Sequence, residues 1–219
     1  MTILCIETST SVCSAAICKD GEPVKQCICL EGSNHARLLP RYLEELLSFA
    51  REQNLSIDAV ALSEGPGSYT GLRIGTSTAK GLCYGLNVPL IPVPTLDVLK
   101  HASGIQEGVL IPMIDARRME VYTMINGETK AVVIENEENL YTGNEDVYYF
   151  GDGAEKCTKV FTKSNWRYIS DIVPEAQFVG ALAEQSSISN HQSAINIAYY
   201  EPFYLKEFIA AQSHVKGLI

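Results

Sequence analysis

Short apolar runs separated by turn residues fill the first thirty positions of the chain. The segments 2–9, 11–21 and 22–32 are rich in Ile, Val, Cys and Ala, and the stretch Lys19–Glu22 has the Asp-Gly signature of a two-residue hairpin. Runs of this length bounded by turn residues are typical of strands. The pattern therefore predicts an antiparallel meander of three strands at the start of the chain.

The hydrophobic period then changes from that of a strand to that of a helix. Apolar residues at 38, 39, 42, 43, 46, 47 and 50 follow the three-and-four spacing of an amphipathic helix over about 35–51. Ser33 or Asn34 is the expected cap. Because Pro40 is tolerated only near a first turn, we expect the regular helix to begin a few residues late.

Helical and strand patterns alternate in the rest of the first half. A strand at 58–64, a helix over 69–86, a strand at 89–93 and a helix from about 95 follow one another, which predicts a mixed α/β layout. The segment "GIQEG" marks a boundary, and the strand pattern that follows echoes the first half. We therefore predict a first lobe over 1–104 and a reduced second copy over 105–219, whose tail packs back on the body.

The loop "SEGPGSYTG", between the strand and the helix, resembles a phosphate-binding loop. Gly71 is not followed by lysine, so a Walker loop is excluded, and Gly65, Gly67 and Gly71 do not have the dinucleotide-binding spacing. Two interpretations stay open. The loop is either a tight turn capped by Ser68 or Thr70, or a weak anion or nucleotide contact at a helix start.

Small residues recur along the predicted helix 69–86. Gly71, Gly75, Ala79 and Cys83 are four residues apart, with Gly81 and Gly85 as a second small pair. Each internal glycine costs about 1 kcal/mol of helix propensity, so close packing must compensate. The ridge packs either on the chain's own sheet or against a helix of a partner, and both alternatives stay open.

Composition and charge argue against a nucleic-acid-binding protein and against a membrane protein. The formal charge is −9, with 46% hydrophobic and 20% charged residues, and the basic residues are scattered. A large nucleic-acid interface is therefore not expected. The start of the chain has no leader pattern, and no apolar run approaches the ~20 residues of a membrane span, so a cytoplasmic protein is expected.

The seven cysteines include no Cys-x-x-Cys pair, which argues against a zinc site or a disulfide framework. Cys27 and Cys29 are two apart in a strand pattern and are expected on one face, in the core.

Several segments together resemble one protein family. They are "ILCIETSTSVCSAAI", "NHARLLPRYLEELL", "EGPGSYTGLRIGTSTAKGLCYGL", "VPTLDVL", "MIDARRMEVY" and "EPFYLKEF". In these segments the chain resembles the bacterial TsaB family, also called YeaZ. The resemblance implies an actin-like ATPase and ribonuclease-H-like fold, with two lobes that each hold a mixed sheet flanked by helices. It also implies a role in forming N6-threonylcarbamoyladenosine at position 37 of tRNAs that read codons beginning with adenine.

The resemblance further implies a noncatalytic scaffold that activates TsaD, the metal-binding transferase of the system. TsaE, an ATPase, joins the assembly, tRNA is held mainly through the partner, and the free chain is expected to form a homodimer. The two predicted helices would form the TsaD interface. Its expected residues are His35, Leu38, Leu39, Tyr42, Leu46, Gly71, Leu72, Gly75, Thr76 and Ala79.

Cofactor residues depart from the patterns of related proteins. TsaD-type relatives carry His-x-x-x-His, whereas His35 is followed by Leu39 at that spacing, so no metal is expected. A vestigial phosphate hairpin is expected at Glu7, Ser9 and Thr10, with Glu7 in place of the commoner aspartate, and 151–154 is expected to be a turn. No nucleotide is expected to bind the chain alone. ATP or ADP at the partner interface would contact Ser68, Tyr69, Thr70 and Arg73.

An enzyme of the same fold is the competing hypothesis. The alternatives are a metal-dependent peptidase and a small-molecule kinase. A peptidase needs a metal or an activated nucleophile, and the sequence has neither His-Glu-x-x-His nor a serine or cysteine with an evident base. The kinase hypothesis rests on the fold alone.

Overall fold

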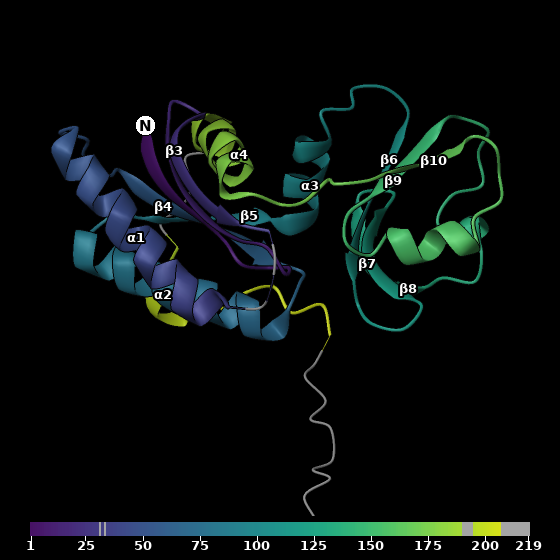
Figure 1. The fold of residues 1–219 in the computed structure, drawn as a ribbon, viewed down its shortest axis with the longest axis horizontal. Coiled ribbons are helices and arrows are strands. Elements are labelled where there is room, and N and C mark those ends of the chain that lie inside the picture. Colours follow the sequence, from purple (N-terminus) through teal and green to yellow (C-terminus); the bar gives the residue numbers. More distant parts are fainter. Residues whose placement is uncertain (31, 33, 190–194, 207–219) are drawn as a thin grey trace, which may run out of the picture.

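A five-stranded sheet forms the centre of the first lobe. The computed structural model describes residues 1–30, 32, 34–189 and 195–206, and shows two lobes side by side (Figure 1). The strands of the first sheet lie in the order β3-β2-β1-β4-β5. They are β1 (Thr2–Glu7), β2 (Cys13–Lys19), β3 (Glu22–Cys29), β4 (Ala59–Gly65) and β5 (Leu90–Pro94). Strands β1 to β3 form the predicted antiparallel meander, and Asp20 and Gly21 make its two-residue turn with positive φ.

The sheet of the second lobe repeats this arrangement. Its order is β10-β9-β6-β7-β8, with β6 antiparallel to β7 and parallel to β9. The strands are β6 (Val109–Asp115), β7 (Glu120–Ile125), β8 (Glu128–Val133), β9 (Val147–Phe150) and β10 (Trp166–Ile169). Each strand has a counterpart in the first sheet, which confirms the predicted duplication. The four-residue β10 was not predicted from the sequence.

Helices cover both faces of the first sheet. Helices α1 (His35–Glu52) and α2 (Tyr69–Leu86) lie on one face, and α4 (Ala176–Ser189) lies on the other (Figure 1). Because helices cover both faces, successive apolar residues of β1 are buried on opposite faces of the sheet. Leu4 and Ile6 pack with α1 and α2, whereas Ile3 and Cys5 pack with α4.

Helix α1 begins earlier than its proline suggested. It starts at His35, with Asn34 as its N-cap residue but without a side-chain cap bond, and Pro40 lies inside the helix. The ring of His35 anchors the first turn, because its Nε2 lies 2.9 Å from the carbonyl oxygen of Thr10 and 3.1 Å from that of Val12. This anchor stabilises helical turns before the proline, so the predicted late start was wrong.

The second lobe has short connections where the first has long helices. The segments are η1 (Glu137–Asn139) and η2 (Glu155–Lys159), both 3-10 helices. Helix α3 (Thr95–Ser103) lies between the lobes (Figure 1). Its Leu96 and Leu99 pack with Ile114 and Phe150 of the second lobe.

The end of the chain returns to the first lobe. Helix α4 packs on strands β1 and β2, and the turn η3 (Ile197–Tyr199) contacts α2. Lys80 Nζ donates to the carbonyls of Ala198 (3.0 Å) and Tyr200 (3.1 Å), and the amide of Phe203 donates to the carbonyl of Glu64 (2.8 Å). The predicted division at 104 separates the two sheets, while α4 lies on the sheet of the other lobe. The domain limits stay a prediction.

Candidate functional site

The glycine loop is a tight turn that closes on the chain's own backbone. Ser68 is the N-cap of α2, and its Oγ accepts a hydrogen bond from the amide of Gly71 (3.3 Å). A Cβ on Gly67 would overlap the carbonyl of Ser9, and one on Gly71 would overlap that of Thr8. These glycines therefore allow α2 to approach the β1–β2 turn, and this geometry favours the first of the two interpretations.

The small-residue ridge of α2 packs on the first sheet. Gly71, Gly75, Ala79 and Cys83 are all buried, and a Cβ on Gly75 would collide with the side chain of Thr8. Of the two alternatives, the structure therefore has the one in which the ridge packs on the chain's own sheet. Most of the expected TsaD-contacting residues are therefore core residues of this chain; they are His35, Leu39, Leu46, Gly71, Leu72, Gly75, Thr76 and Ala79. Leu38 and Tyr42 are half-buried.

Other residues of the two helices form an outward surface. Tyr84 is 89% exposed, and Tyr199, whose η3 turn (Ile197–Tyr199) contacts α2, is 84% exposed. The second small pair, Gly81 and Gly85, is exposed, and a methyl group added at either glycine would meet no atom within 4 Å. A hollow of about 360 Å³ on α1 is lined by Arg41, Tyr42, Glu44, Glu45 and Ser48. We call the exposed positions of α1 and α2 the outer helix face.

The residues predicted to contact nucleotide lie at the start of α2. Arg73 is exposed, its guanidinium lies 5.4 Å from the ring centre of Tyr69, and its Nη1 donates to the hydroxyl of Tyr69 (3.2 Å). The ring centre of Tyr204 lies 5.1 Å from that of Tyr69. Ser68 and Thr70 are exposed beside them. The structure brings these residues together at the surface, and nucleotide binding by them stays a prediction.

The acid of the predicted phosphate hairpin faces inward. Glu7 has no exposed surface, and its Oε1 accepts bonds from the amide (2.6 Å) and hydroxyl (2.5 Å) of Ser9. The hydroxyl of Ser63 donates to its Oε2, while Thr10 uses its own hydroxyl to accept from the amide of Val12 (3.3 Å). Burial raises the pKa of Glu7. Ser63 belongs to this site and was not predicted from the sequence.

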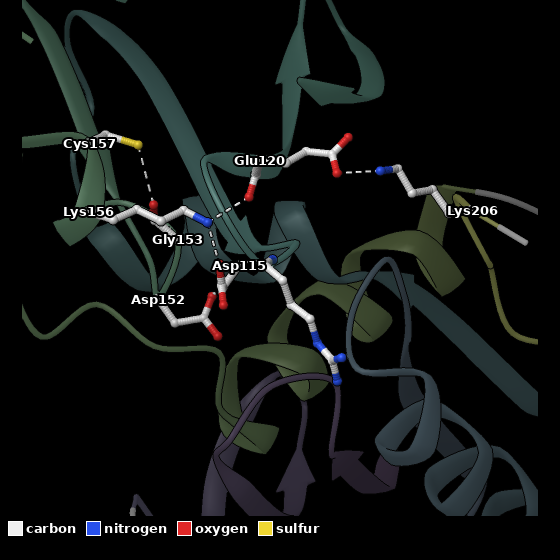
Figure 2. Close-up of polar contacts among 8 residues, drawn as sticks. Asp115, Glu120, Asp152, Gly153, Lys156, Cys157 and Lys206 are labelled. Atoms are coloured by element: carbon white, nitrogen blue, oxygen red, sulfur yellow. Dashed lines mark hydrogen bonds and ion pairs between the residues drawn. The ribbon is translucent and has the colours of Figure 1, made fainter. Parts of the chain in front are cut away.

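A second acidic group, Asp115 and Asp152, lies in the other lobe. Asp152 is close enough to Glu7 for its charge to raise the pKa of Glu7 further. Asp152 accepts a hydrogen bond from the amide of Asp115 (2.9 Å). Partial desolvation raises the pKa of Asp152, and the charge of Asp115 adds to the effect. Lys156 pairs with Asp115 and donates to the carbonyl of Glu120 (2.6 Å), as Figure 2 shows. This group was not predicted from the sequence. The duplication was a usable signal, because Asp115 ends β6 as Glu7 ends β1.

Glu7 does not fit the role of holding magnesium and phosphate that the fold family implies for the acid of the first hairpin. Both oxygens of Glu7 already accept hydrogen bonds within the protein, so they are not turned toward a ligand. Within the described ranges, no three His, Cys, Asp or Glu side chains are placed to hold a metal ion. In the same ranges, no helix combines the length and apolar character needed to cross a membrane.

Comparison with known proteins identifies the family. The family described as "TsaD: tRNA N6-adenosine threonylcarbamoyltransferase" matches residues 30–212. The chain belongs to the TsaD family, on its TsaB (YeaZ) branch. The tRNA threonylcarbamoyladenosine biosynthesis protein TsaB of Haemophilus influenzae is 28% identical, over 94% of both chains. TsaB of Bacillus subtilis is also 28% identical, over 85% of this chain and 82% of its own length.

A solved structure supports the fold at the level of the whole chain. YeaZ from Pseudomonas aeruginosa superposes with a TM-score of 0.71 and 26% identity, covering 93% of this chain and 99% of its own. The resemblance read from the sequence motifs and the actin-like, ribonuclease-H-like fold that it implied are both confirmed.

Proposed function

We propose that this chain is a noncatalytic subunit that binds and activates a TsaD-type transferase in the threonylcarbamoyladenosine modification of tRNA. The modified position would be adenosine 37 of tRNAs that read codons beginning with adenine. Membership of the family and the names of its TsaB relatives support the pathway. The outer helix face is the observation that carries the role of a binding partner.

The outer helix face has the composition of a helix-docking surface. Two glycines without internal packing, Gly81 and Gly85, weaken α2 by about 1 kcal/mol each relative to alanine. Small residues at this spacing allow another helix to approach closely, and the exposed ring of Tyr84 supplies apolar area beside them. The face therefore suits a helix pair of a related fold, such as the equivalent helices of TsaD.

The geometry of the acids supports a noncatalytic role. Glu7 is held by two serines, and the loop glycines are used for internal packing rather than for a phosphate. The competing enzyme hypothesis needs a site for a metal ion and a phosphate or a peptide. Turnover of ATP or a peptide by the isolated chain, measured with added divalent metal, would support that hypothesis and contradict ours.

The proposal also covers tRNA, a TsaE-type ATPase and a second copy of the chain. With a net charge of −9, the chain is expected to contact tRNA mainly through the transferase, and a TsaE-type ATPase would join the assembled complex. In the absence of TsaD, two copies would cover the same outer helix face as a homodimer.

A mixing experiment tests the proposal directly. The chain is combined with its cognate TsaD-type protein, and the mass is measured by light scattering after gel filtration. Gly81→Leu and Tyr84→Arg change exposed positions of α2 and should abolish the heteromeric peak without unfolding the chain. Val133→Arg, on an exposed position (59%) of β8, is the matched control and should leave the complex intact.

The choice of variant decides what a loss of binding means. Gly75→Leu would place a large side chain against Thr8 in the core, so loss of binding by that variant would report unfolding. If the wild-type chain forms no complex with TsaD under any nucleotide condition, the proposed function is wrong.

We further propose that Arg73 and Tyr69 contribute to a nucleotide contact at the TsaD interface. Both lie at the start of α2 beside the exposed Ser68 and Thr70. Arg73→Ala should weaken binding of ATP or ADP by the complex and leave the free chain folded. Lys159→Ala, an exposed cation of the second lobe, is the control. Unchanged nucleotide affinity of the Arg73→Ala complex would contradict this contact.

A further inference from the structure

Two cysteines lie directly opposite each other on neighbouring strands. The β2–β3 register pairs Cys13 with Cys29, and pairs Ala15 with Cys27. Because alternate residues of a strand share a face, Cys27 and Cys29 both lie on the side of the sheet that α1 covers. Cys13 and Cys27 pack there in one cluster with Leu39 and Leu43.

The backbone geometry suits a disulfide between Cys13 and Cys29. Directly opposed residues of an antiparallel pair have Cα atoms about 4.5–5.5 Å apart. Disulfides in proteins join Cα atoms about 4.4–6.8 Å apart. The hairpin thus presents the two thiols within bridging range, with no large movement of either strand.

The other described thiols lack this placement. Cys5 pairs with Ala16 and Cys18 with Ile3, so these two are diagonal neighbours on β1 and β2. Their thiols share a hydrogen bond, but both residues are wholly buried under Gly180 of α4 and closed to a peroxide. Cys83 and Cys157 lie on helices of different lobes. Cys13 is wholly buried, whereas Cys29, at the end of the edge strand β3, is partly exposed.

We propose that Cys13 and Cys29 form an oxidation site, which a hydroperoxide converts into a cross-strand disulfide. The thiolate of Cys29 attacks the peroxide oxygen, giving a sulfenic acid and releasing the alcohol, or water when the oxidant is hydrogen peroxide. Cys13 sulfur then attacks the Cys29 sulfur and displaces hydroxide, which leaves as water with the Cys13 proton. In total, two thiols are oxidised and one peroxide is reduced to an alcohol and water.

The site lies under the outer helix face. Tyr42 of α1 packs against the cluster that contains Cys13 and Cys27. A bridge between these strands replaces two separate thiols in the packing beneath this ring, so oxidation should weaken binding of TsaD. This consequence rests on the proposed function, whereas the disulfide itself does not.

Thiol mapping of the full chain tests the disulfide. The reduced protein is treated with hydrogen peroxide, alkylated, digested and sequenced by mass spectrometry without reduction. We expect a cross-link between Cys13 and Cys29 and a mass loss of two hydrogens. Cys29→Ala should lower cross-link formation by Cys13 at least tenfold, whereas Cys27→Ala, one alternation along the same strand, should retain it.

Three results would overturn the oxidation site. They are a cross-link between Cys27 and Cys29 instead, sulfinic acid at Cys29 without a cross-link, or recovery of both thiols unmodified. The wild-type map decides between these outcomes even if a variant fails to fold. Cys5, Cys13 and Cys18 share the tryptic peptide 1–19, and Cys27 and Cys29 share the peptide 26–37. Fragment ions that separate the cysteines within each peptide, together with the Cys27→Ala map, therefore assign the bridge.

A binding measurement then separates the two proposals. Oxidised and reduced chain are titrated into TsaD, and we expect the oxidised form to bind at least tenfold more weakly, with Cys29→Ala insensitive to peroxide. Equal affinity of both forms would contradict the regulatory consequence and leave the disulfide in place. Absence of binding by the reduced chain would contradict the proposed function instead.

Discussion

The two lobes share one strand order but fill their cores in different ways. The first sheet is covered by 18-residue helices, and its close contacts depend on small residues such as Gly71 and Gly75. The second sheet has only short 3-10 turns in the equivalent connections, so large rings fill the space. Phe161 lies 4.9 Å from Trp166 and 5.0 Å from Tyr149, between ring centres.

The shared strand order gives the two lobes an acid at the same position, but not the same surroundings for that acid. The order places an acid at the end of the first strand of each lobe, Glu7 and Asp115. Their surroundings then differ, because Glu7 is fixed by serine hydroxyls while Asp115 pairs with Lys156. Only the first lobe has a pair of long helices among the described residues, so the outer helix face has no counterpart in the second lobe there.

Removing a ring from the second lobe should have the largest effect. Phe161→Ala empties the aromatic cluster, and we expect a loss of about 3–5 kcal/mol in the free energy of unfolding. Trp166, the single tryptophan, lies in this cluster and reports on it by fluorescence. Urea unfolding followed by fluorescence and by circular dichroism measures the change.

The two signals also test whether the lobes unfold together. Coincident transitions in the wild type would show one cooperative unit, and separate transitions in Phe161→Ala would show that the second lobe unfolds first. A loss below about 1 kcal/mol would contradict the view that rings replace helices as the core of this lobe.

Adding a methyl group to the first lobe should have the next largest effect. Gly71→Ala forces its Cβ against the carbonyl of Thr8, and we expect a loss of about 1–3 kcal/mol. Gly81→Ala is the matched control on the same helix, where the added Cβ meets open space, and it should stabilise the chain by up to about 1 kcal/mol. Equal effects of the two changes in thermal unfolding would disprove the packing role of the ridge.

Glu7 should give the first lobe a specific dependence on pH. Burial raises its pKa, so the folded chain binds this proton more tightly than the unfolded chain does. The stability from Glu7 is therefore present below the ordinary carboxyl pKa and is lost as the pH rises through the raised value. Glu7→Gln keeps the shape without the charge, and its stability relative to the wild type should improve as the pH rises.

Urea unfolding at several pH values measures this difference. Glu44→Gln, an exposed change on α1, is the control and should follow the wild type at every pH. Glu7→Ala should instead lose about 1–3 kcal/mol, because the amide of Ser9 and the hydroxyl of Ser63 are left without a buried acceptor. A flat difference between Glu7→Gln and the wild type would contradict the burial effect.

The smallest effect is expected at the contact that joins the chain's end to the second lobe. Lys206 pairs with Glu120, as Figure 2 shows, and the lysine side chain is 44% exposed. An ion pair of this kind contributes about 0–1 kcal/mol. Lys206→Ala should lower the melting temperature by no more than about 2 °C, and high salt should reduce the difference further. A larger, salt-independent loss would show that the pair holds the lobes together.

Local patterns predicted most of the first lobe. The meander, α2 and the Ser68 cap follow from residue spacing and turn chemistry, because their stabilising contacts are close in sequence. The start of α1 was misplaced, since the histidine anchor that holds it comes from contacts with a distant turn. Strand β10 was missed because so short a segment carries too little periodicity.

The candidate site was harder to predict, for a physical reason. Helical spacing identified the ridge of α2 but left open which body it packs against, and the structure places it on the chain's own sheet. The partners of Glu7 and Asp115 come from strands and turns far along the chain, at Ser63, Asp152 and Lys156. Such groupings depend on tertiary packing and leave no local pattern in the sequence.

The position of α4 has a consequence for the order in which the chain assembles during synthesis. One face of the first sheet, with Ile3 and Cys5, stays uncovered until residues 176–189 have left the ribosome. After β5 is complete at Pro94, the N-terminal sheet must therefore wait, with apolar surface exposed, until the chain has been translated as far as Ser189. Long-range closure of this kind slows folding, so the nascent first lobe is a natural client for a chaperone.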